Sequence, residues 1–131
     1  MDIFVPNTDK CLVGKNCYAY ALNLEPFPKS GGGWIAPIGL DVWDWILEGI
    51  LIESPDGDIV IYTSETSDEP IHMGIAENGM VKSKWRDSDV YLHDEFSTPY
   101  GTKTKRYNIA NRRNLIEIWE KAADETANNL K

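Results

Sequence analysis

Apolar residues recur with the spacing of a helix in three stretches of the chain. The first stretch predicts a helix from Cys17 to about Leu24, because a favoured N-cap residue precedes it and prolines follow it. The second predicts a helix over 41–51 with Asp41 as its cap, and the third predicts a helix over 111–127. Two helices near the start and one at the end therefore enclose a different pattern in the middle.

The middle of the chain carries β-branched and alternating apolar residues that are separated by turn signals. Asn78-Gly79 is a strong signal of this kind, because both residues tolerate the positive φ angles of a tight hairpin turn. Residues 1–15 are expected to form an irregular lead-in. Helices, then an antiparallel sheet, then a closing helix make an α+β pattern. Strands are predicted at 58–63, 70–77, 80–85, 90–93 and 103–108.

The composition fits one soluble domain that spans 1–131. The chain has 131 residues, of which 42% are hydrophobic, enough for one core but not for a second domain. Its formal charge of −8 argues against binding to nucleic acid or to an anionic membrane, because phosphates attract basic surfaces. The N-terminal residues lack the features of a secretory signal, and no window reaches the roughly 18 apolar residues of a membrane span. We therefore expect a cytoplasmic protein.

The two cysteines have different surroundings in the sequence. Cys11 and Cys17 are six residues apart, unlike the ligands of a zinc site, and no cluster of histidines accompanies them, so no metal or other cofactor is expected. A disulfide between them stays open for an oxidising compartment. We interpret Cys11 as a small buried apolar residue. Cys17 would lie in the first turn of a helix, where free N–H groups and the helix dipole favour a thiolate.

A nucleophilic thiol needs a base, and the chain has two histidines. His72 lies on the strand before the Asn-Gly turn, so it would meet Cys17 where the first helix packs on the sheet. A third polar residue normally holds the imidazole in its working tautomer. Ser83 is the nearest polar candidate on the returning strand, and His93 or Asp94 on the next strand is the reserve.

Three motifs follow one another along residues 15–90. Asn16-Cys17 opens a helix, Pro55-Asp56-Gly57-Asp58 leads into an apolar strand, and His72-Met73-Gly74-Ile75 precedes the Asn-Gly turn. This order resembles the papain-like NlpC and CHAP superfamily of cysteine peptidases and amidases. The resemblance implies a papain-like α+β fold, with N-terminal helices packed on a small antiparallel sheet and a C-terminal helix.

The resemblance also implies the roles of individual residues. Cys17 would be the nucleophile, His72 the general base and acid, and the backbone amide of Cys17 with Asn16 or Tyr18 the oxyanion donors. The implied function is a thiol hydrolase or acyltransferase that acts on an amide bond of a peptide or protein, as a peptidase, amidase, deamidase or isopeptidase. Ser83-Lys84-Trp85 and Tyr100-Gly101 are similar to a less characterised branch of the same fold.

The chain departs from the superfamily at two points. Ser83 stands where a His, Asn, Asp, Glu or Gln is usual, and a hydroxyl is a weaker partner for an imidazolium, so activity would depend on His93 or be low or absent. The chain is also acidic, whereas cell-wall hydrolases of this kind are exported and often basic. The alternative function is a catalytically inactive papain-like protein that binds and masks a surface of a protein partner.

Aromatic and basic residues outside the motifs are candidate substrate contacts. Trp34 follows the glycine run 31–33, which lacks the residues of a phosphate loop, and is a candidate platform beside a cleft. Trp85, at the end of the Ser83 strand, is a second candidate. Trp34 or Tyr100-Gly101 would be the contact if the chain were a subunit of a larger assembly. Three basic residues are expected on a solvated strand face or against a substrate carboxylate: Lys82, Lys84 and Arg86.

Overall fold

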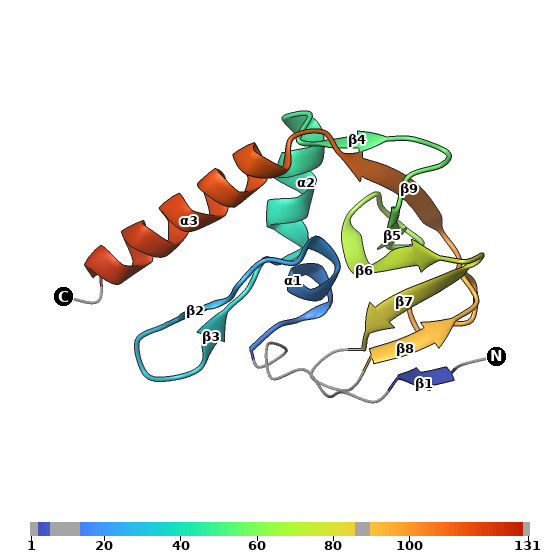
Figure 1. The fold of residues 1–131 in the computed structure, drawn as a ribbon, viewed down its shortest axis with the longest axis horizontal. Helices are drawn as coiled ribbons and strands as arrows, with labels where there is room; N and C mark the ends of the chain where they lie inside the picture. The colour runs from blue at the N-terminus through green and yellow to red at the C-terminus, as the bar shows by residue number, and fades with distance from the viewer. Residues whose placement is uncertain (1–2, 6–13, 86–89, 130–131) are drawn as a thin grey trace.

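The computed structural model describes residues 3–5, 14–85 and 90–129, and its architecture is α+β (Figure 1). The α+β class predicted from the sequence pattern is confirmed. The helices in these ranges are α1 (Cys17–Leu22), α2 (Gly39–Leu47) and α3 (Arg112–Asn129). The strands are β1 (Ile3–Val5), β2 (Phe27–Pro28), β3 (Trp34–Ile35), β4 (Leu51–Glu53), β5 (Ile59–Thr63), β6 (Pro70–Glu77), β7 (Met80–Lys84), β8 (Val90–His93) and β9 (Thr104–Ile109).

Seven of these strands form one antiparallel sheet in the order β1-β8-β7-β6-β5-β9-β4. The other two, β2 and β3, form a separate hairpin that extends on the same side of the molecule as α3 (Figure 1). β6 and β7 are joined by the predicted two-residue turn, in which Asn78 and Gly79 have φ angles of 51° and 81°. The hairpin predicted around this dipeptide is therefore confirmed.

The sheet has two faces with different neighbours. Successive residues of a strand point to opposite faces. Ile61 and Met73 belong to the main core, which also includes residues of all three helices, and we call their side of the sheet the helix face. Val60, Tyr62 and Val81 form a second apolar cluster on what we call the opposite face. Residues next to one another on β5 or β6 thus have different environments.

α2 begins and ends earlier than the sequence predicts. Its N-cap is Ile38, and Asp41 lies in the first turn with its carboxylate accepting a hydrogen bond from the backbone N–H of Ile38 (2.9 Å). The prediction that Asp41 is the cap residue is therefore wrong, although its carboxylate does satisfy an N–H at this helix end. The helix ends at Leu47 because Gly49 adopts a φ of 78° and Leu51 begins β4.

Four short strands fall outside the predicted ones. β1, β2, β3 and β4 are two or three residues long, too short for an alternating pattern to show in the sequence. β1 lies in the stretch that was expected to be irregular, and it pairs with β8 at one edge of the sheet. β4 pairs with β9 at the other edge. The partners of both edge strands are distant in sequence, which explains why no local signal marks them.

α3 is attached through a few long side chains. Arg112 donates hydrogen bonds to the backbone carbonyls of Leu22 and Asn23, the latter at 2.8 Å. Nε1 of Trp119 donates to the carbonyl of Glu25 at 2.7 Å. The rest of the helix runs away from the sheet toward the C-terminus (Figure 1). Within the described ranges, no helix combines the length and apolar composition that a membrane crossing requires.

Candidate active site

Cys17 is the first residue of α1, as predicted. Asn16 caps the helix, because its Oδ1 accepts a hydrogen bond from the backbone N–H of Ala19 (2.9 Å). The thiol belongs to the core on the helix face of the sheet, and the residue is only 8% exposed. The backbone N–H groups of Met73, Tyr18 and Cys17 itself point at the sulfur. The sulfur therefore lies between a helix N-terminus and strand β6.

Burial decides the protonation state of this thiol. Desolvation raises the pKa of Cys17 to about 11, and it outweighs the backbone hydrogen bonds and the positive charge of Lys84, which lower that pKa. Cys17 is a free cysteine. The helix N-terminus favours the thiolate as expected, but in this conformation burial outweighs it and the thiol stays protonated at neutral pH.

Of the two side chains expected to act as oxyanion donors, Asn16 is engaged elsewhere and Tyr18 is buried beside α2. Asn16 uses its amide oxygen for the helix cap, and its Nδ2 donates to the carbonyl of Pro37 (2.6 Å). Tyr18 is buried, which raises the pKa of its hydroxyl, and this hydroxyl lies where a Cβ on Gly39 of α2 would be 3.4 Å away. The backbone N–H groups around the sulfur are therefore better placed than the Asn16 side chain to bind an oxyanion at Cys17.

His72 lies on β6 and is fully buried on the opposite face of the sheet. Its ring stacks on that of Tyr100, with ring centroids 3.9 Å apart and an angle of 7° between the ring planes. The centroid of the Tyr62 ring lies 5.4 Å from that of His72. Neither ring nitrogen has a hydrogen-bond partner in the described part of the chain. Desolvation, together with His93, lowers the pKa of His72 to about 3, so the imidazole is neutral at physiological pH.

The backbone of β6 at His72 lies close to Cys17 in space, but the thiol and the imidazole are not hydrogen-bonded to each other. The thiol packs on the helix face with Met73, whereas the imidazole contacts Tyr62 on the opposite face. One of the N–H groups that point at the sulfur is nevertheless that of Met73, which directly follows His72. The orientation of the His72 side chain is therefore what separates the predicted catalytic pair.

Ser83 and His93 form a hydrogen-bonded pair on the opposite face. Both residues are fully buried, and Oγ of Ser83 lies 2.7 Å from Nε2 of His93. Nδ1 of His93 lies 2.7 Å from the backbone carbonyl oxygen of Asp94. A Cβ on Gly74 would lie 3.1 Å from Cβ of Ser83, so Ser83 packs against β6 two residues from His72. The structure thus brings together the first and the reserve candidates for the third catalytic residue.

The two tryptophans expected to contact substrate have different surroundings. Trp85 follows β7, and its ring stacks on Tyr91 (4.4 Å between centroids) and lies beside His93 (5.6 Å). Its indole N–H is buried and has no hydrogen-bond partner among the residues described. Trp34 is half-exposed on β3 of the small sheet, where its ring covers Gly14. Trp85 is thus part of the aromatic cluster around His93, and Trp34 belongs to a separate surface.

The basic residues near the end of β7 do not form one solvated face. Lys84 is buried, at 5% exposed, and its charge lowers the pKa of Cys17. The prediction that Lys84 is solvated is therefore wrong, because the alternation of β7 places it among the residues around the thiol. Lys82 is half-buried. Arg86 and Cys11 lie outside the described residues.

The loop of residues 94–103 places Tyr100 over His72. At its start, the backbone carbonyl of Glu95 accepts a hydrogen bond from the hydroxyl of Tyr62 (2.5 Å), and the Glu95 carboxylate contacts two side chains of β9. The sequence interpretation did not place Tyr100 beside His72, because this contact joins distant segments. Among local signals, only the aromatic side chain of Tyr100 and the glycine after it mark the position.

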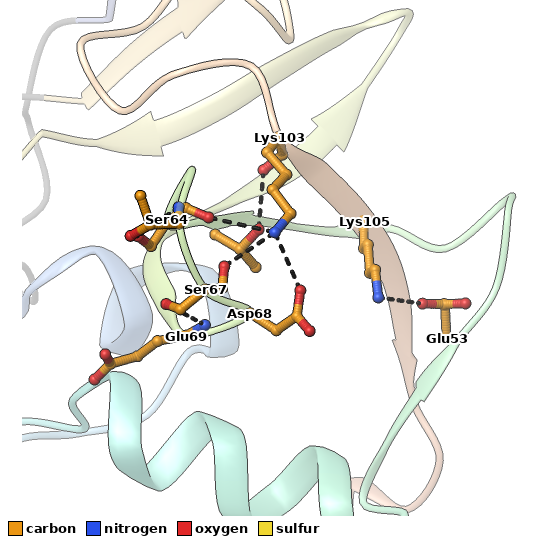
Figure 2. A network of polar contacts seen from close by, with 9 residues as sticks. Glu53, Ser64, Ser67, Asp68, Glu69, Lys103 and Lys105 are labelled. Carbon is orange, nitrogen blue, oxygen red and sulfur yellow. Dashed lines mark hydrogen bonds and ion pairs between the residues drawn. The ribbon is translucent and has the colours of Figure 1, made fainter.

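Lys103 holds the other end of this loop (Figure 2). Its side chain reaches across to the segment 64–69, which leads into β6. The backbone N–H of Thr102 also donates to the carboxylate of Glu65 (3.4 Å). The loop over His72 is therefore tied to the segment that precedes the His72 strand. The acceptors of the Lys103 ammonium are the carbonyls of Ser64 (3.4 Å) and Ser67 (3.0 Å) and the carboxylate of Asp68 (3.1 Å).

Other features of the described residues do not add to this site. A hollow of about 400 Å³ beside α2, lined by Trp43, Ile46 and Tyr107 among others, contains none of the predicted site residues. Within the described ranges, no group of three or more His, Cys, Asp or Glu side chains is placed to hold a metal ion. The chain matches no family model, no curated protein and no solved structure. The functional argument therefore depends on the geometry around Cys17 and His72.

Proposed function

We propose that the chain is a papain-like thiol hydrolase or acyltransferase that acts on an amide bond of a peptide or protein. One observation carries the proposal: the Cys17 thiol lies at a helix N-terminus, beside the peptide unit that joins His72 to Met73. Amide N–H groups from both the helix and the strand point at the sulfur. Such groups favour a thiolate, and they favour an oxyanion formed next to it.

In this proposal the described conformation is a resting state. Because strand alternation places the imidazole and the thiol on opposite faces of the sheet, the active state requires the backbone of β6 to turn at His72, so that the imidazole leaves its stack on Tyr100 and reaches the sulfur. The imidazole then takes the thiol proton, and the sulfur attacks the amide carbonyl, whose oxyanion accepts hydrogen bonds from the backbone N–H groups at Cys17. The imidazolium gives its proton to the leaving amine. Water, or an acceptor amine, attacks the thioester, loses a proton to His72 and releases Cys17.

The proposed chemistry needs no cofactor, because one thiol and one imidazole supply every bond and proton transfer. It does need a reduced thiol, and we therefore propose a cytoplasmic setting, in which thiols are kept reduced. The partner in this proposal is the peptide or protein that carries the amide bond.

Alkylation of Cys17 by iodoacetamide tests the pair, with peptide mass spectrometry as the readout and Cys11 as the internal comparison. Wild-type Cys17 is expected to react only as the pH approaches its raised pKa of about 11. Tyr100→Ala removes the ring that stacks on His72. We therefore expect the apparent pKa for alkylation of Cys17 to fall by at least about one unit. Adding His72→Ala to Tyr100→Ala is expected to abolish that movement.

Tyr91→Ala is the matched control. It also removes a stacked tyrosine ring, but that ring stacks on Trp85 and not on His72. We expect it to leave the alkylation profile unchanged. If Cys17 became as reactive in the double variant as in Tyr100→Ala, solvation alone would activate the thiol and His72 would not be its base. The hydrolase proposal would then fail.

The same pKa values favour a second function, an inactive papain-like domain that masks a basic surface of a protein partner. A protonated thiol and a neutral, covered imidazole form a stable state without catalysis. The formal charge of −8 suits a basic partner. Binding through these charges would weaken as the salt concentration rises. Absence of His72-dependent reactivity in Tyr100→Ala would favour this function over the hydrolase.

A further inference from the structure

The hydrogen bonds of His93 determine which of its nitrogens carries a proton. A backbone carbonyl can only accept, so the 2.7 Å contact between Nδ1 and the Asp94 carbonyl places a proton on Nδ1. In the neutral ring Nε2 then has a lone pair, to which the Ser83 hydroxyl donates across 2.7 Å. Both side chains are fully buried, so bulk water does not compete for the bond between Ser83 and His93. The hydrogen bonds therefore run in one direction, from Ser83 to Asp94.

The Ser83 hydroxyl lies on the same face of the sheet as an imidazole that has no partner. The register of β6 and β7, extended by one pair beyond Ile75, places Ser83 opposite Gly74, two residues from His72. The close approach at Gly74 agrees with this placement. Both nitrogens of His72 lack a hydrogen-bond partner in the described part of the chain. Because the Ser83 proton is held by His93, only the oxygen lone pairs of Ser83 are left for His72.

We infer that His93 is a positioning residue for His72: it makes Ser83 a hydrogen-bond acceptor for one N–H of the His72 imidazole. This inference rests on the proposed function. A hydroxyl without such support either donates or accepts, so it would not select a tautomer of His72. With its proton held by His93, Ser83 accepts from one nitrogen of His72 and leaves the other free to take the proton of Cys17.

Each proton has a defined place in this arrangement. When His72 takes the thiol proton of Cys17, both of its nitrogens carry N–H groups, one directed at the sulfur and the other at Oγ of Ser83. The bonds from Ser83 to His93 and from His93 to Asp94 keep their direction and become more polarised. The titratable groups that face His72 are Tyr62, Tyr100 and His93. No further proton donor is needed.

The tautomer of His93 can be measured on the full chain without any assay of activity. The chain has two histidines, so long-range ¹H–¹⁵N spectra resolve both rings, and His93→Phe assigns them. We expect the proton of His93 on Nδ1. A neutral His93 with its proton on Nε2 would overturn the inference, because Ser83 would then accept from His93 rather than donate to it.

Acetylation of Cys17 by p-nitrophenyl acetate across pH tests the effect on His72, with Tyr100→Ala as the parent protein. His93→Phe keeps a ring of similar size but has no nitrogen, so the Ser83 hydroxyl becomes free to donate to His72. We expect the reaction to slow by roughly ten-fold or more and its pH profile to shift. Ser83→Asn added to His93→Phe supplies an amide oxygen, which can accept a hydrogen bond from His72 without help from His93. This double variant is expected to restore the rate and the pH profile.

Each outcome bears on one of the two proposals. If the parent protein shows no His72-dependent acetylation, the proposed function fails and the role of His93 fails with it. If the reaction depends on His72 but His93→Phe leaves its rate and pH profile unchanged, only the role of His93 is overturned. If Ser83→Asn does not restore a slowed reaction, His93 acts through packing, and the inference is again overturned.

Discussion

The buried imidazole of His72 makes the stability of the fold depend on pH. Its pKa falls from 6.5 to about 3 on folding, so between these values the unfolded chain binds a proton that the folded chain does not. Stability must therefore decrease as the pH falls through this window, by up to about 1.4 kcal/mol per pH unit. The decrease ends near pH 3, where the folded state also takes up the proton.

We expect His72→Phe to remove this pH dependence. Phenylalanine keeps a ring against Tyr100 and removes two buried nitrogens that lack partners, so the free energy of unfolding at neutral pH should rise by about 1 kcal/mol. Urea unfolding of both proteins between neutral pH and pH 4 measures the effect. The other titrating groups are common to both, so the difference reports His72. Parallel pH dependences would show that His72 titrates normally in the folded protein.

Local patterns were enough to single out Cys17 and His72, because one lies at a helix start and the other lies on a strand before a tight turn. The protonation states of both were not predictable, since they depend on burial by distant segments. Tyr100 covers His72 through a loop contact that no spacing marks. The hydrogen bond of Ser83 to His93 depends in the same way on the register of β7 and β8.

Between elements, Lys103 links the loop over His72 to the segment 64–69 (Figure 2). Lys103→Met keeps the aliphatic stem but removes three hydrogen bonds, so we expect faster amide exchange in 64–69. Lys105→Met is the matched control: Lys105 is on the same strand, and its 3.6 Å ion pair with Glu53 is largely exposed and contributes little. Hydrogen exchange with mass spectrometry compares the two. Equal exchange in both variants would show that Lys103 does not hold this segment.

The longer elements were predictable and the short ones were not. α3 and the hairpin of β6 and β7 have clear periodicity or a clear turn signal. The predicted second helix extends to Leu51, the first residue of β4, because Ile50 and Leu51 also fit its helical pattern. The positive φ of Gly49 ends that pattern in the structure. A short strand at a sheet edge is defined by its partner, here β9, rather than by its own residues.

Across the whole molecule, the sequence predicted the α+β class but not the order of the strands. Neighbours such as β5 and β9, or β1 and β8, are far apart in the chain, and their pairing leaves no local pattern. The docking of α3 was also not predictable. It depends on hydrogen bonds from Arg112 and Trp119 to backbone carbonyls at the end of α1 and just after it. These bonds connect the end of the chain to the helix that carries Cys17.

Trp119 is expected to make α3 part of the same cooperative unit as α1. Trp119→Ala removes the ring contacts with Phe27 (4.8 Å between centroids) and Trp45 (6.4 Å), and we expect it to lower the free energy of unfolding by about 3–5 kcal/mol. Trp119→Phe keeps a six-membered ring but loses the hydrogen bond to the carbonyl of Glu25 and part of the indole volume, so it should cost less than Trp119→Ala, about 1–2 kcal/mol.

Urea unfolding followed by far-ultraviolet circular dichroism and by alkylation of Cys17 measures both variants with two independent probes. Because α3 contacts the chain just after α1, the midpoints of both probes should move together to lower urea, further for Trp119→Ala than for Trp119→Phe. If the circular dichroism midpoint moved while the alkylation midpoint of Cys17 stayed in place, α3 would unfold independently. The helix that carries the thiol would then be stabilised by the sheet and α2 alone.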